Sequence, residues 1–160
     1  MHPDFIIPDW PAAANVRALV TTRTLPGASV APFHAFNLGV YCGDAPQAAR
    51  ENRRRLIELA NLPSSPHWLK QVHGIEVLRF DAPPAPDAVA MEADAAVTST
   101  SGVVLCVQTA DCLPVLFASR YGDEVAVAHA GWRGLANGVL EATLAAMRSA
   151  PADVIAWLGP

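Results

Sequence analysis

The stretch Val-Ala-Val-Ala-His-Ala-Gly-Trp-Arg-Gly, residues 125–134, decides the fold of this chain. Its first half is an apolar run with β-branched residues, which predicts a short buried strand with His129 and Val127 on one face. The second half, residues 131–134, is punctuated by glycine and predicts a turn. Apolar residues then recur at three- and four-residue steps, which predicts a helix from about Leu135 to Arg148. His129 is therefore expected at the edge of a sheet, where α/β proteins usually bind ligands.

Composition sets limits on the class of protein. The 160 residues are 52% hydrophobic and 16% charged, which predicts a folded domain with a real core. The net charge of −4 gives no sign of nucleic-acid binding, and no apolar run approaches the roughly 20 residues that span a bilayer. No signal peptide is expected, and three cysteines without a CxxC pair fit a reducing compartment. We therefore expect a cytoplasmic protein.

The remaining elements follow from the same patterns and predict an α/β chain. Asp44-Ala-Pro-Gln is a helix start with Asp44 as N-cap, and the helix is expected to reach about Ala60 with Asn52 on its inner stripe. A polar residue on that stripe needs a partner. Strands are predicted, in chain order, at residues 17–22, 68–72, 75–80, 94–98, 103–107, 115–118 and 154–158. The second and third are expected to form a hairpin, and the fifth, which is apolar on both faces, a buried central strand.

Three predicted strand ends carry metal-binding side chains: His73, Cys112 and His129. If they converge, two imidazoles and one thiolate form a ligand set that suits zinc, with a fourth position open to a reactant. The spacing alone is not diagnostic, so three unrelated residues at strand ends remain an alternative.

Two further hypotheses use the same residues. Cys112 and His129 could be a nucleophile and its base, with Asp111 or Gln71 as the orienting group. The zinc could instead be structural, which usually requires a fourth protein ligand, and His34, His67 and Cys106 are the candidates to supply it.

An anion site is also expected next to His129. Gly131-Trp-Arg-Gly precedes a helix, so backbone N–H groups and the Arg133 guanidinium would point to one place. The alternative is a tight turn with Arg133 in a surface ion pair. The stretch is neither a Walker loop nor a dinucleotide-binding fingerprint.

Three motifs carry a resemblance to a known family. Gln71-Val-His-Gly, Thr109-Ala-Asp-Cys-Leu-Pro-Val and His129-Ala-Gly-Trp-Arg-Gly resemble the YfiH-like proteins. These are called purine nucleoside phosphorylases and, by an older label, laccase-domain or polyphenol oxidase proteins. Further matches are residues 21–23, 37–39, 44, 51–53 and 157–160. Family members continue for about another third beyond the last Gly-Pro, so residues 1–160 are expected to be a single YfiH-like domain truncated at its C-terminal end.

The resemblance implies a zinc site made by His73, Cys112 and His129. It implies a layered α/β/β/α sandwich with mixed sheets, similar to the catalytic domain of cytotoxic necrotizing factor. It also implies phosphorolysis of adenosine, inosine and methylthioadenosine to free base and ribose 1-phosphate, together with adenosine deamination. The expected partners are thus purine nucleosides and phosphate, with neither nucleic acid nor membrane.

Under this hypothesis, several residues receive roles. Arg23, Asn37 and Gln71 are candidates for holding the sugar or base, and Arg133 for holding phosphate. Asp111, beside Cys112, is a candidate for a general acid or base or for supporting the metal ligand.

The alternatives are a copper-dependent polyphenol oxidase and a cysteine hydrolase or amidase that edits cell-wall precursors. A multicopper oxidase needs more histidines than the five present, and no methionine is obviously placed as an axial ligand for a single copper. The cytidine-deaminase pattern, H-x-E with P-C-x-x-C, is absent.

Overall fold

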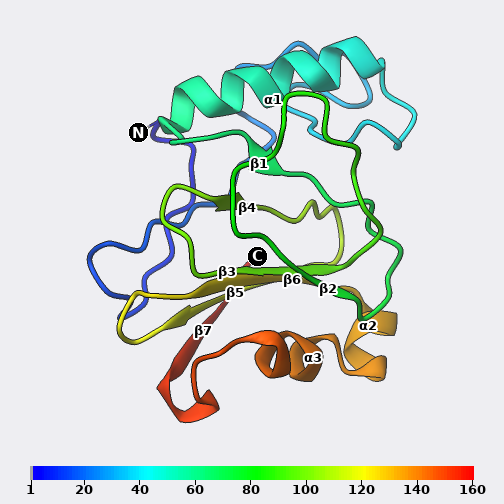
Figure 1. Ribbon diagram of the computed structural model, residues 1–160. Helices are drawn as coiled ribbons and strands as arrows, with labels where there is room; N and C mark the ends of the chain where they lie inside the picture. Colours follow the sequence, from blue (N-terminus) through cyan, green and yellow to red (C-terminus); the bar gives the residue numbers. More distant parts are fainter. Residues whose placement is uncertain (1) are drawn as a thin grey trace. The chain divides into compact units, whose positions relative to one another are not determined.

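The computed structural model describes residues 2–160 (Figure 1). The chain forms two compact units, which we describe separately. Unit 1 holds the N-terminal residues through Pro8 and Leu19–Pro63, and unit 2 holds Asp9–Ala18 and Ser64–Pro160. The single-domain organisation stays a prediction.

Unit 1 is organised by helix α1 (Pro46–Ala60), which confirms the predicted helix. Asn52 on its inner face is fully buried. Its amide donates to the Ser29 hydroxyl at 2.9 Å and the Asn37 carbonyl at 2.8 Å, and its oxygen accepts from the Ala28 N–H at 2.7 Å. The helix thereby fixes the irregular chain that precedes it.

Two predictions for unit 1 are wrong. Asp44 is not the N-cap, because its buried carboxylate accepts hydrogen bonds from the Ser29 hydroxyl, the Asn37 amide and the Ala45 N–H; the cap position is Ala45, without a side-chain cap. The strand predicted at residues 17–22 does not form. Only Val20 pairs, in an isolated bridge with Ile6, and the boundary between the units falls within this stretch.

Unit 2 contains a mixed five-stranded sheet in the order β2-β3-β6-β5-β7. Its strands are β2 (Val77–Arg79), β3 (Ala95–Thr98), β5 (Leu113–Ser119), β6 (Val125–Ala130) and β7 (Val154–Leu158). β2 and β3 are parallel and the other pairs are antiparallel. A second, two-stranded parallel sheet joins β1 (Pro66–His67) to β4 (Val104–Leu105). The mixed α/β class predicted from the sequence is confirmed, as are the predicted strands that correspond to β2, β3, β5, β6 and β7.

Successive side chains of the large sheet point to opposite faces, and each face carries a buried cluster. One face meets helix α3 (Val139–Ala146), and Val97, Phe117 and Ala128 pack there with Val139 (Figure 1). The opposite face forms a second cluster in which Ala96, Leu116 and Val127 pack with Leu69 and Leu105. No described helix is long and apolar enough to cross a membrane.

The structure corrects the predicted hairpin and central strand. Residues 68–72 make only an isolated bridge, between Lys70 and Glu92, and β2 pairs with β3 rather than with that stretch. The strand predicted at 103–107 shortens to β4, which is half-buried, because it pairs only with the two residues of β1.

The predicted last helix is also different. It begins at Trp132, because the Leu135 N–H already donates to the Gly131 carbonyl at 2.9 Å, so residues 131–134 are a helix start and not a separate turn. It then divides into α2 (Trp132–Asn137) and α3 at Gly138, whose φ of 94° is left-handed. A short 3-10 helix, Pro151–Asp153, leads into β7.

A buried carboxylate ties the C-terminal end of α3 to the sheet. Glu124, 3% exposed, accepts hydrogen bonds from the Arg79 guanidinium at 2.7 Å and from the N–H groups of Arg148 and Ser149. Burial raises the pKa of Glu124, but the bonds from Arg79 and Ser149 outweigh burial and hold the pKa below its ordinary value of 4.5.

We predict that Glu124→Gln lowers the free energy of unfolding at pH 7 by about 2 kcal/mol or more, since it leaves buried donors unmatched. Because the folded pKa is lowered, this stabilisation is present above pH 4.5 and is lost as the pH falls through the folded pKa. Urea unfolding at pH 7 and near pH 3 measures both effects. Glu58→Gln, which removes an exposed ion pair with Arg54, is the control and should change much less. Equal losses in the two variants at pH 7 would contradict the prediction.

Candidate metal centre

Strand register gathers the site at one end of the five-stranded sheet. Ala95 pairs with Ala128, so Asp94 lies opposite His129, and the His129 N–H donates to the Asp94 carbonyl at 2.7 Å. On the other side of β6, Leu113 pairs with Ala130, so the next position along both strands sets Cys112 beside Gly131. Segments far apart in the chain therefore meet at the last residues of β6.

Asp94 connects the loop before β2 to this end of β6. Its carboxylate is fully buried and accepts from three successive backbone N–H groups, those of Val72 at 3.1 Å, His73 at 2.9 Å and Gly74 at 2.7 Å. It also bonds His129 Nδ1 at 2.8 Å. Burial raises the pKa of Asp94, but the bond to His129 and the three backbone bonds outweigh it, so the pKa is lowered and the carboxylate stays ionised.

These contacts set the orientation of both histidines. Because Asp94 is an acceptor, it holds the His129 proton on Nδ1 and leaves Nε2 as a free electron pair, the arrangement typical of metal-binding histidines. His73 has a left-handed φ of 60°, which is uncommon outside glycine. The three amides donating to one anion form a backbone nest that stabilises this conformation.

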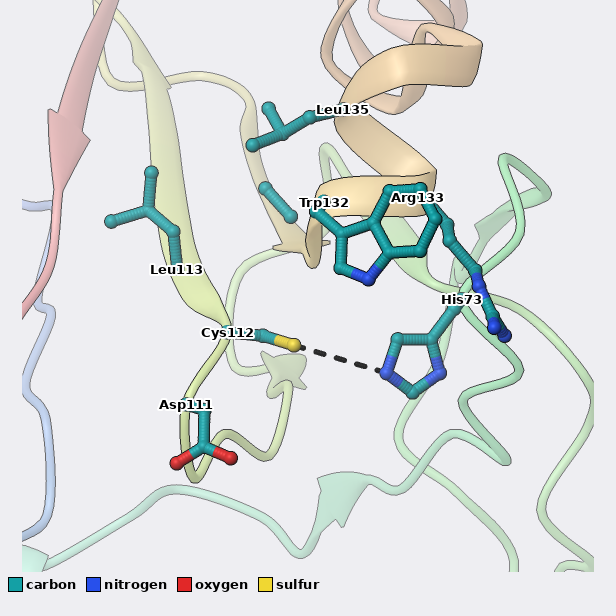
Figure 2. A pocket seen from close by; sticks show the side chains of 8 residues that line it. His73, Asp111, Cys112, Leu113, Trp132, Arg133 and Leu135 are labelled. Carbon is teal, nitrogen blue, oxygen red and sulfur yellow. Dashed lines mark hydrogen bonds between the residues drawn. The ribbon is translucent and has the colours of Figure 1, made fainter.

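The side chains of His73, Cys112 and His129 converge, as the family resemblance implies. Their potential ligand atoms all lie within 4.8 Å of one another. The imidazole centroids are 4.8 Å apart, and Cys112 Sγ lies 3.8 Å from His73 Nε2 (Figure 2). Tetrahedral zinc with N and S ligands requires ligand separations of about 3.4–3.8 Å. Small side-chain adjustments would therefore bring this donor set onto one metal ion.

Space for the cluster depends on Gly131. A Cβ atom at this position would lie 2.8 Å from Cys112 Sγ and 2.9 Å from His73 Cδ2. The residue caps α2 with an ordinary φ of −67°, so the need for glycine is steric and not conformational. A side chain here would fill the place where two of the three potential ligands meet.

The cluster opens to solvent on one side. His129 is buried, Cys112 half-buried and His73 exposed. A pocket of about 500 Å³ lies against it, within the usual range for small-molecule sites. The pocket is lined by His73, Asp111, Cys112, Leu113, Ala130, Trp132, Arg133 and Leu135. The arrangement can hold a metal ion and present it to a small molecule.

Three other sequence predictions concern polar residues around the site. Asp111 and Arg133 line the pocket, and both are exposed. Gln71 makes reciprocal 2.7 Å hydrogen bonds with the backbone of Gln108, which ties the His73 loop to the segment before Cys112. As substrate contacts or proton carriers, these residues stay predictions.

Arg23 and Asn37 belong to unit 1, where each makes a polar contact. Arg23 is exposed and donates to the His34 carbonyl at 3.3 Å. Asn37 donates to the Asp44 carboxylate at 2.9 Å. Their roles as substrate contacts also stay predictions.

Two of the three candidates for a fourth protein ligand, His67 and Cys106, lie in unit 2 and do not join the cluster, whereas His34 lies in unit 1. His67 stacks on Phe80 with centroids 3.7 Å apart, and its Nε2 pairs with the Ala82 carbonyl at 2.8 Å. Cys106 donates its thiol proton to the His67 carbonyl. The cluster of the described residues therefore has three potential ligands, as a site with an open position would.

Sequence reasoning missed Asp94 and Trp132. Asp94 opens the predicted strand at 94–98, whereas in the structure it directly precedes β3, and an acidic residue between apolar neighbours is a weak signal of a buried partner. Trp132 was included in a predicted turn, whereas it is the first residue of α2 and lines the pocket.

Comparison with known proteins agrees with the motifs. A family model described as multi-copper polyphenol oxidoreductase laccase matches residues 17–160. A purine nucleoside phosphorylase of Xylella fastidiosa is 54% identical, and the alignment covers 97% of this chain and 62% of the relative. The purine nucleoside phosphorylase YfiH of Escherichia coli is 50% identical with the same coverage. The chain thus spans about three fifths of the length of these relatives.

Solved structures agree with this similarity. A crystal structure of a Neisseria meningitidis protein is 46% identical with a TM-score of 0.87, covering 98% of this chain and 62% of that one. The structure of YlmD from Geobacillus stearothermophilus is 28% identical with a TM-score of 0.89, covering 100% and 63%.

We predict that Asp94→Asn weakens zinc binding by about 10- to 100-fold, because an amide cannot accept all four hydrogen bonds. Competition with a chromophoric chelator measures the zinc affinity, and ¹⁵N NMR of the metal-free protein reports the His129 tautomer. Glu92→Gln is the control. Glu92 lies two residues from Asp94 and forms an exposed ion pair with Lys70, so its substitution should leave the zinc affinity and the His129 tautomer unchanged. Wild-type zinc affinity in the Asp94 variant would show that the carboxylate does not support the ligand.

We predict that Gly131→Ala abolishes tight zinc binding while the sheet still forms, because the added methyl group displaces Cys112 and His73. Gly74→Ala is the matched control, since its Cβ would meet only ordinary contacts at 3.5 Å and beyond. Zinc titration followed by calorimetry and circular dichroism tests both variants. Equal zinc affinity in the two would refute the steric argument.

Proposed function

This chain belongs to the YfiH-type laccase-domain family, and from that membership we propose that it is a zinc-dependent enzyme acting on purine nucleosides. The observation that carries the proposal is the convergence of His73, Cys112 and His129, whose ligand atoms lie within 4.8 Å of one another beside an open pocket. The most similar relatives described above are named purine nucleoside phosphorylases.

The donor set supports zinc. Two imidazoles and one thiolate match its borderline-soft preference, and three protein ligands leave one position for a reactant. Zinc bound there would supply a Lewis acid that polarises the oxygen of a bound reactant. Copper is the alternative metal suggested by the family description. A multicopper centre would need further clusters of ligands, and the described residues contain one such cluster.

We propose phosphorolysis of adenosine, inosine and methylthioadenosine as the main reaction. A phosphate oxygen forms a bond to C1′ of the ribose, the bond from C1′ to N9 of the base breaks, and the base leaves with a proton. The exposed Arg133 guanidinium at the pocket can hold the phosphate. The Asp111 carboxyl at the same pocket is our candidate for delivering the proton to the base.

Adenosine deamination is the second proposed reaction. Water adds at C6 of the purine and ammonia leaves, so the substrate must turn a different atom toward the same cluster. A pocket of about 500 Å³ has room for a nucleoside to bind in more than one orientation.

We also propose Arg23, Asn37 and Gln71 as contacts to the sugar or the base. The free cysteines support a reducing, cytoplasmic location.

We predict one zinc ion per chain and phosphate-dependent release of hypoxanthine from inosine by the full-length protein. Zinc is measured by elemental analysis, and products are measured by chromatography with and without phosphate. Cys112→Ser should lose zinc and turnover together, because a hydroxyl is a poor zinc ligand. Cys106→Ser, which changes a thiol outside the cluster, is the control and should retain both.

The cysteine-hydrolase alternative predicts a different behaviour of Cys112. There Cys112 acts as a free thiolate with an imidazole base, so alkylation should be fast, unaffected by zinc, and inactivating. Zinc protection of Cys112 from alkylation would count against a hydrolase. Absence of both zinc and nucleoside turnover in the full-length protein would reject the proposed function.

A further inference from the structure

A tryptophan at the pocket beside the metal cluster has no role in the function proposed so far. Trp132 is 73% exposed although tryptophan is among the side chains with the most apolar surface to bury. It is the first residue of α2 and follows Gly131, the residue against which Cys112 and His73 pack. Its indole lines the same pocket as His73 and Cys112 (Figure 2).

Arg133 orients the indole and occupies one of its faces. The guanidinium carbon lies over the ring, 5.2 Å from its centroid, which is a favourable cation–π distance. Most of the indole surface stays open. An aromatic plane at a pocket is suited to stacking on a flat aromatic ligand.

The surroundings favour a nucleobase as that ligand. Leu113, Ala130 and Leu135 add apolar surface to the same pocket, and its polar lining residues are His73, Asp111, Cys112 and Arg133. A nucleoside has the same division, with a flat base on one end and hydroxyl groups on the other. Stacking of a base on an aromatic side chain contributes about 1–3 kcal/mol and tolerates different bases.

We propose that Trp132 is the stacking surface for the purine base and so contributes to the binding of purine nucleosides. This inference rests on the proposed function for its substrate class. Stacking on a plane also agrees with a substrate range of several purines, because every purine has the same flat faces.

Binding of inosine without phosphate tests the inference separately from turnover. In calorimetric titrations of the full-length protein, Trp132→Leu should raise the inosine dissociation constant by about tenfold or more, whereas Trp132→Phe should stay within about threefold. Ribose 1-phosphate lacks a base, so its binding should be unchanged in Trp132→Leu. Tyr121→Leu, which removes an aromatic that is 71% exposed outside the pocket lining, is the matched control.

The outcomes separate this inference from the proposed function. If inosine binding depends on Trp132 but no hypoxanthine is released, phosphorolysis is refuted and stacking is upheld. If the wild type releases hypoxanthine and Trp132→Leu binds inosine normally, only stacking is refuted. Stacking is also overturned if the wild type binds no inosine, or if Trp132→Leu loses zinc or changes oligomeric state, since the indole would then serve the fold or an interface.

Discussion

The candidate site depends on one buried carboxylate. Asp94 is fully buried, and its oxygens accept from the N–H groups of residues 72–74 and from His129 Nδ1. An ion in this environment is tolerated only because each oxygen has charged or dipolar partners. The same contacts orient the imidazole of His129, which lies on β6, and fix the loop that carries His73. Asp94 thereby ties the His73 loop to the end of β6.

The second constraint is steric. Antiparallel register places Cys112 beside Gly131, and the missing side chain there lets the sulfur and the His73 ring approach. The hydrogen bonds of Asp94 thus orient the two histidines. The absence of a side chain at Gly131 leaves room for Cys112 Sγ and the His73 ring. Both act through strands β3, β5 and β6, so the position of the site follows from the sheet and not from flexible loops alone.

The sequence predicts those helices and strands that are specified by a local pattern of residues. Apolar runs of β-branched residues locate β3, β5, β6 and β7, and the motif around Asp44 predicts α1. The convergence of His73, Cys112 and His129 is anticipated by the family resemblance, since the spacing of the three residues alone leaves it open. Parallel pairing of β2 with β3 is not predictable in this way, since it joins segments through a long connection and leaves no periodic signature. The role of Asp94 is hidden for the same reason, because it depends on register between strands.

X-ray absorption at the zinc edge of the zinc-loaded protein tests the central claim most directly. A single ion held by His73, Cys112 and His129 should show one sulfur near about 2.3 Å and nitrogen or oxygen neighbours at about 2.0–2.1 Å, four ligands in total. The sulfur contribution should disappear in Cys112→Ser. A zinc environment without sulfur, or one with two or more sulfurs, would contradict a centre built from these three side chains.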